Sequence, residues 1–476
     1  MSGFEKKLND GDICGIFAGA GDFTRREIIC RGQKLICYSI DGLVSGNSIA
    51  EQVLKPISQD LQGDAMENLY RHALEGAVYS AVAKPCADLR DVAMKLVNGF
   101  CVILFPGVGA VAYEVKTGEK RNPSAPEVEN TVKGPKDAFV ETVRSNTGLI
   151  RRHLRSPDLR LYETTVGRRT LTNVTVVWLE GITSRDLVEQ MKNRLGQIDV
   201  DGFLFPAAVE EYVTGSRATA FPLLQYTERT DRFCQGLLDG RVGLLIDGIP
   251  LGYLAPVCIG NLMESPEDRS RDYISASCVR ILRYAALLAG LLLPAVYTAL
   301  VGHHPGWIPE VLRTLISESR TGVPFSAGGE VLSLLIAYEL LQESGIHLPQ
   351  AIGQSVSTIG GIVVGTAAVE AGLISPVVLI AVSIAGVCGF VLPNRDLANG
   401  LRVWRFGLAA ISGIAGAWGL LTGVSLMLIH LASLRSMGRA YLRVRVGQGR
   451  GLVRTRFKHM KRRDSALNPE DPTNQK

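Results

Sequence analysis

The stretch AIGQSVSTIGGIVVGTAAVEAGLISPVVLIAVSIAGVCGFVL, residues 351–392, contains no arginine or lysine, and Glu370 is its only formal charge. A turn at this residue, followed by Ser375-Pro376, divides the stretch into two apolar segments of about 20 residues each. At about 1.5 Å per residue, each segment is long enough to cross a hydrocarbon core of about 30 Å. The stretch therefore predicts a membrane hairpin with spans at 352–369 and 374–392.

Two further apolar stretches flank this hairpin, at residues 281–301 and 406–431. Between the first of them and the hairpin lie a polar connection, residues 302–325, and an amphipathic segment, 330–343, that carries three glutamates. This segment is too charged for a lipid-facing span, so we expect it at an interface or against other helices. We therefore expect residues 276–434 to form an all-α transmembrane domain of about four spans.

A repeated pattern organises the more charged N-terminal part of the chain. An apolar strand, an acidic residue followed by glycine, and a helix occur twice, with Asp41 and Glu180 at matching places 139 positions apart. A second pair of turns, at Asn98 and Asp239, introduces two strand–turn–strand segments 141 positions apart. Two features at nearly the same spacing predict a soluble module of two tandem, similar α/β subdomains.

These patterns divide the chain into five parts. We expect α/β subdomain 1 at 1–120, a linker and helix at 121–157, α/β subdomain 2 at 158–275, the transmembrane helical domain at 276–434 and a basic tail at 435–476. The helix of the linker should begin at about Lys136, and Arg151 and Arg152 should lie on its solvated face.

Basic residues lie next to the predicted spans. The tail carries eleven arginines and lysines between residues 435 and 463 with no acid among them. Directly after a span, such a tail is typical of a cytoplasmic anchor on anionic lipid. The side chains that we expect to face lipid headgroups are Arg280, Arg283, Arg435, Arg439 and Arg443.

The membrane topology follows from the number of spans. The N-terminal sequence has no apolar core of a signal peptide, so we expect the α/β module in the cytoplasm. Four spans place the basic tail on the same side. They also place the connection with Arg395, Arg402 and Arg405 outside, which conflicts with the positive-inside tendency.

No motif in the sequence indicates catalysis. The phosphate loop, the HExxH helix, the G-x-S-x-G elbow and a GxGxxG turn after a strand are all absent. The nine cysteines form no CxxC pair or Cys/His cluster, which favours reduced thiols over a zinc site. The net charge of +5 does not suggest nucleic acid as a partner. We therefore expect no enzyme activity and no catalytic, cofactor-binding or metal site.

Polar and small residues in the predicted spans are the candidate functional residues. Polar groups at membrane depth usually face a bundle interior or an aqueous path, and hydroxyls with a carboxylate suit the wall of a cation path. In the alternative, the hydroxyls bond to their own helix and the carboxylate lies among the headgroups. The candidate pore-lining residues are Gln354, Ser355, Ser357, Thr358 and Glu370; the candidate helix-packing glycines are Gly361, Gly365, Gly419 and Gly423.

Several long stretches, in order along the chain, resemble the A-subunit family of spore germination receptors, the GerA family. No single stretch would be specific, but together they cover nearly the whole chain after about residue 30. They include GPKDAFVETVRSNTGLIRRHL, TVGRRTLTNVTVVWLEGIT, LLLPAVYTALVGHHPGWIP, ESGIHLPQAIGQSVSTIGGIVVGTAAVEAGLISP, LPNRDLANGLRVWRF and IHLASLRSMG.

The resemblance implies an A subunit of a nutrient germinant receptor in the spore inner membrane, with the α/β module and the tail on the core side. Its partners would be membrane lipid, a transporter-like B subunit, a lipoprotein C subunit and further copies of the chain in an oligomeric cation channel. The basic ending after Gly438 departs from the family pattern. Alternatives are therefore an accessory subunit of the sporulation-protein AF type, or a non-conducting scaffold, that assists dipicolinate release.

Overall fold

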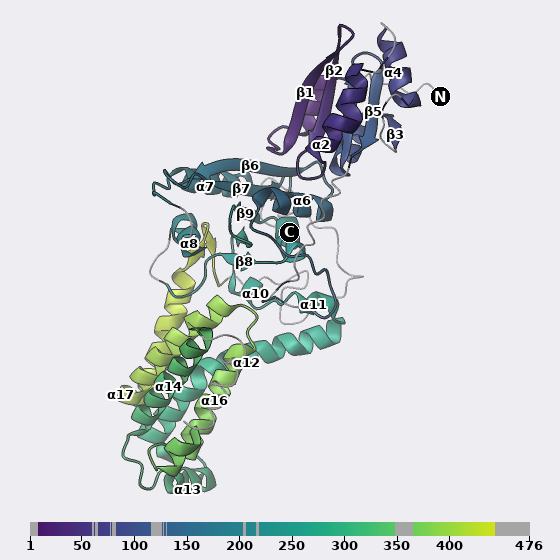
Figure 1. Cartoon of the computed structure of the whole chain (residues 1–476). Helices are drawn as coiled ribbons and strands as arrows, with labels where there is room; N and C mark the ends of the chain where they lie inside the picture. Colours follow the sequence, from purple (N-terminus) through teal and green to yellow (C-terminus); the bar gives the residue numbers. More distant parts are fainter. Residues whose placement is uncertain are drawn as a thin grey trace, which may run out of the picture. The chain divides into compact units, whose positions relative to one another are not determined.

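The computed structural model describes residues 8–59, 61, 65–76, 78, 82–115, 126, 128–129, 131–202, 206–215, 219–347 and 365–442 (Figure 1). The chain forms two compact units. The α/β unit contains the described residues of 1–215 and 224–256, and the helical unit contains those of 216–223 and 257–461. The units meet in sequence at 256/257, nearer the N-terminus than the expected boundary at 275/276.

The first half of the α/β unit is a five-stranded antiparallel sheet in the order β1-β2-β4-β5-β3. Side chains of neighbouring residues point to opposite faces of a strand, so Cys37 and Tyr38 of β2 enter different hydrophobic clusters. The elements are α1 (Asp10–Ile16), β1 (Phe23–Cys30), β2 (Gln33–Ile40), α2 (Gly46–Ser48), the π-helical turn η1 (Ile49–Leu54), α3 (Lys55–Gln59), α4 (Met66–Glu75), β3 (Ala83–Cys86), α5 (Leu89–Val97), β4 (Phe100–Phe105) and β5 (Gly109–Glu114).

The second half is another five-stranded antiparallel sheet, in the order β6-β7-β9-β10-β8. The strand order repeats that of the first sheet, so the predicted tandem repeat is present in the structure. The elements are α6 (Val143–His153), β6 (Leu159–Val166), β7 (Thr172–Leu179), α7 (Arg185–Gly196), α8 (Pro206–Thr214), β8 (Gln225–Thr227), α9 (Thr230–Leu238), β9 (Val242–Ile246) and β10 (Gly252–Ala255).

A buried ion pair joins the two subdomains of the α/β unit. Arg151 of α6 donates through Nε and Nη2 to both carboxylate oxygens of Asp22, at 2.8 and 2.7 Å, and neither side chain is exposed. Next to this pair, a Cβ atom on Gly148 would lie 2.6 Å from the carbonyl oxygen of Gly42, so only glycine fits there. The expectation that Arg151 lies on a solvated face is wrong, and the helix begins at Val143 rather than at Lys136.

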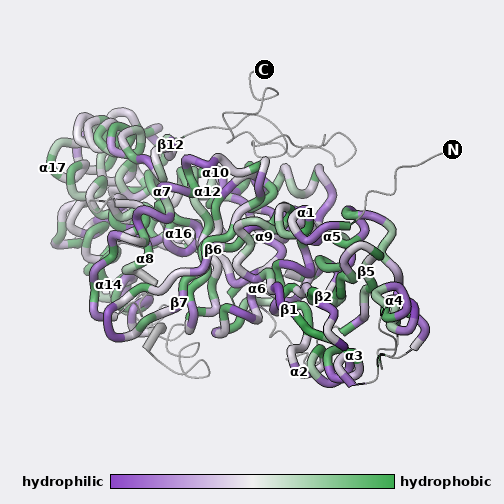
Figure 2. Tube along the Cα trace, turned by 90° about the horizontal axis from the view of Figure 1, so that it is seen from above, coloured by the Kyte–Doolittle hydropathy of each residue, from purple (hydrophilic) through white to green (hydrophobic). Residues whose placement is uncertain are grey.

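The helical unit is more apolar than the α/β unit. In Figure 2 its helices are green or white over much of their length, whereas α4 and α7 carry purple segments. Residues 365–370 are also helical. The other elements are α10 (Ile259–Leu262), α11 (Glu267–Ser270), α12 (Tyr273–His303), the 3-10 turn η2 (Pro305–Trp307), α13 (Glu310–Ser319), α14 (Ala327–His347), α16 (Pro376–Phe390), α17 (Arg395–Ser433), β11 (Arg435–Ser436) and β12 (Arg439–Ala440).

Two helices of the described residues, α12 and α17, are long and apolar enough to cross a membrane, and α16 is a shorter apolar helix of 15 residues. The predicted span at 281–301 lies within α12, and most of the span at 374–392 lies in α16. Most of the span at 352–369 lies outside the described residues. The described residues therefore contain fewer candidate spans than the four that we expected.

The helix α17 is not straight, because it reverses direction at Gly416. This residue has φ 57° and ψ −135°, a backbone conformation that interrupts a helix. The rings of Trp404 and His430 have centroids 5.5 Å apart, whereas a straight helix would separate these residues by about 39 Å. A Cβ atom on Gly423 would likewise lie 2.6 Å from the side chain of Leu408. The predicted single span at 406–431 is therefore wrong, because the chain forms two antiparallel arms.

The reversal decides which helix ends lie together. One hydrophobic cluster joins Leu291 of α12 to Leu401 of the first arm and to Leu431 of the second. At the other end of the bundle, a Cβ atom on Gly416 would lie 2.7 Å from the side chain of His303, where α12 ends. Both ends of α17 thus lie toward the start of α12, and the turn between its arms lies toward the end of α12.

Candidate functional site in the helical unit

A buried carboxylate connects three helices near the end of α12. Glu330 of α14 is fully buried and accepts a 2.9 Å hydrogen bond from Nε of Arg320, the residue that follows α13. Its other oxygen accepts a 2.9 Å hydrogen bond from the backbone N–H of Ser375. Ser375 in turn caps α16 by accepting from the N–H of Val378. The expected interfacial segment 330–343 thus contributes a buried anchor to the bundle.

A second polar cluster lies toward the other end of α14. Arg402 of the first α17 arm donates to Oε1 of Glu339 and to Oε1 of Gln342, each at 2.6 Å. Gln342 also donates to the hydroxyl of Tyr338 at 2.9 Å. These contacts join α14 to α17 through side chains that are only partly buried, so the cluster contacts the surface of the bundle.

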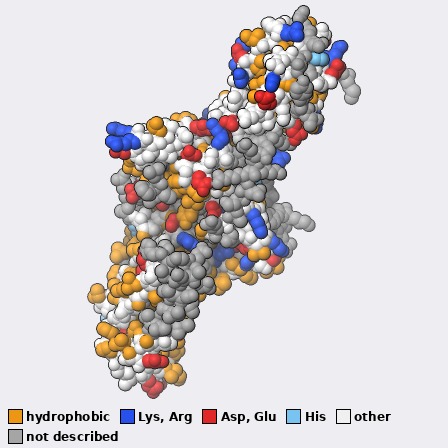
Figure 3. Space-filling view, in the orientation of Figure 1, with side chains coloured by type: hydrophobic (Ala, Val, Ile, Leu, Met, Phe, Trp, Pro, Cys, Tyr) orange, Lys and Arg blue, Asp and Glu red, His pale blue; other side chains and the backbone are white. Residues whose placement is uncertain are grey.

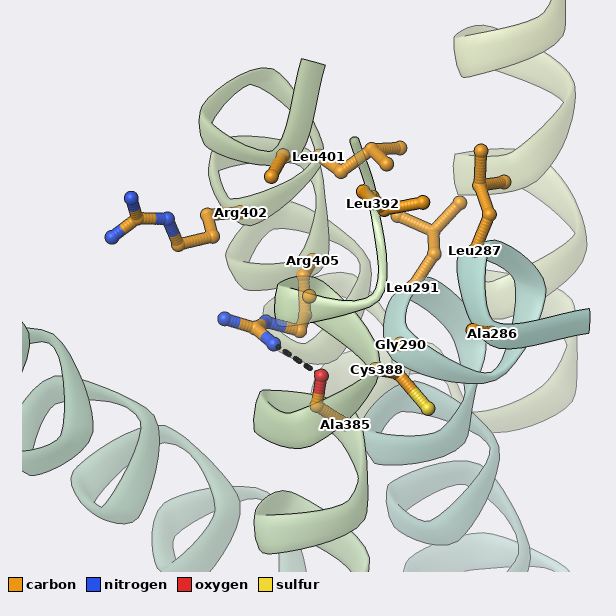
Figure 4. Close-up of a pocket in the computed structure, with 12 residues that line it drawn as sticks. Ala286, Leu287, Gly290, Leu291, Ala385, Cys388, Leu392, Leu401, Arg402 and Arg405 are labelled. Atoms are coloured by element: carbon orange, nitrogen blue, oxygen red, sulfur yellow. Dashed lines mark hydrogen bonds between the residues drawn. The ribbon is translucent and has the colours of Figure 1, made fainter. Parts of the chain in front are cut away.

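Arg405 is the most deeply buried cation of this region, with 4% of its surface exposed. Its Nη1 donates to the carbonyl oxygen of Ala385 at 3.2 Å, and Nε has no partner among the described residues. Figure 4 shows the guanidinium turned toward Ala385, while Arg402 extends away from the leucines. Both arginines line a shallow hollow, open to the outside, whose other walls are Ala286, Leu287, Gly290, Leu291, Ala385, Cys388, Gly389, Leu392, Ala398 and Leu401.

The two arginines at the start of α12 are not exposed to headgroups. Arg280 and Arg283 are 5% and 7% exposed. Arg283 Nη1 donates to Oδ2 of Asp268 at 2.6 Å, and Arg280 Nε donates to the same oxygen at 3.4 Å. The expectation that they face lipid is therefore wrong in this structure, because the carboxylate of Asp268 holds both of them inside the helical unit.

The segment after α17 holds two distant parts of the chain together. Ser436 of β11 is fully buried, and its Oγ donates to the carbonyl oxygen of Leu223 at 2.6 Å. The same Oγ accepts from the backbone N–H of Val257 at 3.0 Å. Leu223 is the last residue of the first segment in the helical unit, 216–223, and Val257 is the first residue of the second, 257–461. We name this arrangement the Ser436 clasp.

An aromatic group supports the Ser436 clasp. The ring of Phe221 lies 6.4 Å from the rings of Trp404 and Tyr441 and 6.2 Å from His430. His430 Nε2 and the hydroxyl of Thr219 are 3.0 Å apart. The segment at 219–223 therefore packs between the two arms of α17. No local pattern in the sequence predicted this contact, because His430 and Thr219 lie 211 positions apart.

The other predicted site residues are placed as follows. Glu370 is exposed at the end of the helical residues 365–370, and Gly365 is buried, with its Cβ position 3.4 Å from Leu379 of α16. Arg435 is exposed and Arg439 is half-buried, on the two short strands after α17. Gly419 and Gly423 face the other arm of α17. Gln354, Ser355, Ser357, Thr358, Gly361 and Arg443 lie outside the described residues.

Among the residues that the structure describes, no group of three or more His, Cys, Asp and Glu side chains is placed to hold a metal ion. The polar side chains of the helical unit bind one another and the backbone in pairs across helices. Such an arrangement can couple the positions of helices. It also places fixed positive charge, from Arg402 and Arg405, where α16 meets α17.

Comparisons with known proteins identify the family of this chain. The family model described as Bacillus/Clostridium GerA spore germination protein matches residues 12–466. The uncharacterized membrane protein YfkQ of Bacillus subtilis is 32% identical over 404 residues, 85% of this chain and 78% of the relative. Spore germination protein KA of the same organism is 32% identical over 429 residues, 89% and 78% of the two chains. Spore germination protein B1 is 30% identical over 450 residues, 93% of each chain.

One solved structure is also similar. It is the crystal structure of the N-terminal domain of the A subunit of the Bacillus megaterium spore germinant receptor GerK3. The alignment covers 51% of this chain and 91% of that domain at 26% identity, with a TM-score of 0.41. The family match, by contrast, spans both units of the chain. The resemblance expected from the sequence is therefore confirmed, and this chain belongs to the GerA family of spore germination proteins.

Proposed function

We propose that this protein is the A subunit of a nutrient germinant receptor and acts in the spore inner membrane to start germination. The observation that carries this proposal is the family match over residues 12–466, which includes both the α/β repeat and the helical bundle. Relatives that align with most of the chain are named spore germination proteins. The apolar helices α12 and α17 support a membrane location.

In this proposal the α/β unit and the basic tail lie on the same side, facing the spore core. The bundle contains α12, α14, the segment that includes 365–370, α16 and the two arms of α17. If each crosses the membrane, the number of crossings is even. The connection with Arg395, Arg402 and Arg405 then lies on the core side, together with the start of α12. This removes the conflict with the positive-inside tendency that four spans produced.

The subunit would act as part of an oligomeric cation channel, assembled with a B subunit and a lipoprotein C subunit. Gln354, Ser355, Ser357 and Thr358 stay candidates for the wall of the path, with Glu370 at one end. The buried cation Arg405 argues that the path does not run between α16 and α17, because a fixed positive charge repels cations. The ion pairs Glu330–Arg320 and Glu339–Arg402 would hold α14 against α13 and α17. The segment that carries the candidate pore residues would move relative to them.

The test is release of potassium and dipicolinate from spores that lack this chain, across a panel of single nutrients. A receptor A subunit predicts loss of the response to one class of nutrient, with the other responses intact. Complementation with the unaltered gene is the control. Slower release with every nutrient would instead favour the accessory AF-type subunit. Unchanged release in a strain without paralogous receptors would contradict both.

A further inference from the structure

The helix α13 (Glu310–Ser319) buries little of its apolar surface against the rest of the described protein. Ile316 is its only buried residue. Val311, Leu312 and Leu315 are 76%, 51% and 57% exposed, and Trp307, just before the helix, is 70% exposed. At 10 residues, α13 is shorter than the length of about 12 residues at which isolated helices become marginally stable in water. So short a helix depends on its surroundings, and its exposed apolar face therefore requires an apolar partner.

The apolar residues of α13 form one stripe. At about 100° per residue, positions 311, 315, 312 and 316 follow one another within an arc of about 140°. Ile316, at one edge of the arc, is the residue that packs on the bundle. The stripe therefore continues outward from the bundle, away from the protein core. Glu310, Arg313, Thr314 and Ser317 occupy the opposite side, so the helix is amphipathic over its first two turns. In the last turn, Glu318 borders the stripe beside Val311 and Ser319 lies within it.

The place of α13 in the helical unit indicates what covers this stripe. The helix follows α12, a candidate membrane span, after a connection of six residues, His304–Pro309, in which the rings of His304 and Trp307 stack at 4.8 Å. The outer walls of the bundle are themselves apolar: Leu288 of α12 is 55% exposed, and Ile414 and Trp418 of α17 are 82% and 72% exposed. Figure 3 shows orange side chains over much of the helical unit. The stripe is thus continuous with a surface that requires lipid.

The orientation of α13 is set by the buried carboxylate described above. Arg320, which ends α13, donates to Glu330 through Nε and to the carbonyl oxygen of Phe325 through Nη2, at 2.9 and 3.3 Å. Because Glu330 also binds the N–H of Ser375, the end of α13 is tied to the starts of α14 and α16. These contacts hold the end of α13 at the end of the bundle where α14 and α16 begin.

We propose that α13 lies flat in the lipid–water interface at the end of the bundle where α12 finishes, with Val311, Leu312 and Leu315 inserted among the acyl chains near the headgroups. Tryptophan is typical of this layer, because its ring is apolar and its N–H is polar, and Trp307 begins the segment. Through Arg320 and Glu330, the packing of lipid in this layer acts on the positions of α14 and α16. This inference concerns the bilayer contact and does not depend on which nutrient, ion or partner the protein serves.

The experiment measures the depth of Trp307 in vesicles of brominated phosphatidylcholine that contain the full-length protein. In the measured variant the other three tryptophans, Trp178, Trp404 and Trp418, are changed to phenylalanine, so all fluorescence comes from Trp307. Bromine quenches tryptophan only on close approach. We expect quenching about twofold stronger with bromine near the carbonyl end of the acyl chain than with bromine near its methyl end.

The control moves the single tryptophan from position 307 to the polar side of α13, as Trp307→Phe with Thr314→Trp. Here we expect little quenching by either lipid, which separates insertion of the stripe from general closeness to vesicles. Quenching of Trp307 that is absent, or equal to that of the control, would overturn the proposal. Protection of Trp307 from quenching could instead increase with the number of protein copies per vesicle. This result would overturn the proposal, because it would mean that a second copy of the chain covers the stripe.

A second pair of variants tests the proposal without tryptophan. Leu315→Glu places a charge in the stripe, and Ser317→Glu places the same charge on the polar side. We expect hydrogen exchange of the α13 backbone amides in nanodiscs to be about tenfold faster in the first variant and unchanged in the second, because a buried charge must leave the acyl layer. Equal exchange in the two variants would contradict insertion, and unchanged exchange in α12 and α14 would show that the bundle is folded.

Discussion

The two α/β subdomains have one strand order, but they fill the face between sheet and helix with different residues. In the second subdomain, the ring of Phe233 on α9 packs directly on Gly243 and Gly252. A Cβ atom on these glycines would lie 2.2 and 2.5 Å from the ring, so only glycine fits there. In the first subdomain, the residue on α5 at the place of Phe233 is Val92, which belongs to the cluster that also contains Val102 and Ala110.

The pairing registers show that these positions correspond. Tyr38 pairs with Val102 as Val177 pairs with Gly243 in the second sheet. Leu104 pairs with Ala110 in the same way as Leu245 pairs with Gly252. One subdomain thus uses a small helix residue with larger strand residues, and the other uses an aromatic ring with glycines. The repeat thus keeps the strand order, and it divides the volume of this face differently between helix and strands.

The largest effect should come from breaking the joint between the two subdomains. Asp22→Asn leaves the guanidinium of Arg151 buried without a full counter-charge, so we expect the free energy of unfolding to fall by about 3–5 kcal/mol. Denaturation of the full chain in detergent measures it. The control is Arg144→Gln, which removes the exposed pairs with Asp41 and Glu163 nearby and should cost about 1 kcal/mol or less. Equal losses in the two variants would mean that the subdomains do not depend on this pair.

A smaller effect should come from exchanging one packing solution for the other. Gly243→Val places a side chain against the Phe233 ring, and we expect a loss of about 2–3 kcal/mol. Adding Phe233→Val gives positions 233 and 243 the residues that the first subdomain has at positions 92 and 102. The loss of unfolding free energy in the double variant should be about 1 kcal/mol smaller than the sum of the losses in the two single variants, because the two side chains are in contact. Strict additivity would contradict the volume exchange inferred from the comparison.

The smallest effect on stability should come from the hydrogen-bonded pair of His153 and Asp137, which precedes the first strand of the second subdomain. Nε2 of His153 lies 2.5 Å from Oδ2 of Asp137; the hydrogen bond raises the pKa of His153 and lowers the pKa of Asp137. The stabilisation is therefore greatest between the unfolded pKa values of the two groups, about 4 and 6.5. It falls as the pH rises through the raised pKa of His153, and as it drops through the lowered pKa of Asp137.

Because both side chains are partly exposed, we expect this pair to contribute about 1 kcal/mol or less. Unfolding of the full chain measured between about pH 5 and about pH 9, a range that contains the ordinary histidine pKa of about 6.5, checks it. His153→Gln should remove the loss of stability on the alkaline side. A pH profile that the substitution leaves unchanged would assign the loss to other groups.

The repeat could be predicted from the sequence because its turns need particular residues. Asp41 and Glu180 each follow the second strand of a sheet, and Asn98 and Asp239 each end the helix before the third paired strand. These are short-range requirements, which one sequence displays directly. The apolar spans could be predicted for a similar reason, because length and composition alone decide whether a helix is able to cross lipid.

The buried charges could not be predicted in this way. Arg151, Arg280 and Arg405 appear in the sequence as ordinary polar residues of helices, and only the folded chain brings Asp22 or Asp268 to two of them. The reversal at Gly416 was also hidden, because small residues such as Gly413 and Gly419 precede and follow it and each is compatible with a straight apolar helix. The Ser436 clasp joins residues 213 positions apart, beyond the reach of any local pattern.

The reversal of α17 leaves almost no loop. Gly416 alone makes the turn, and it is itself buried beside His303. In a membrane, a protease, an antibody or a labelling reagent added from that side would find no extended segment between the two arms. Reporter fusions placed before and after the two arms would report the same side of the membrane, so they would score no crossing between these points. A hydropathy profile would count the two arms as one span, and it would assign every residue after Leu434 to the wrong side of the membrane.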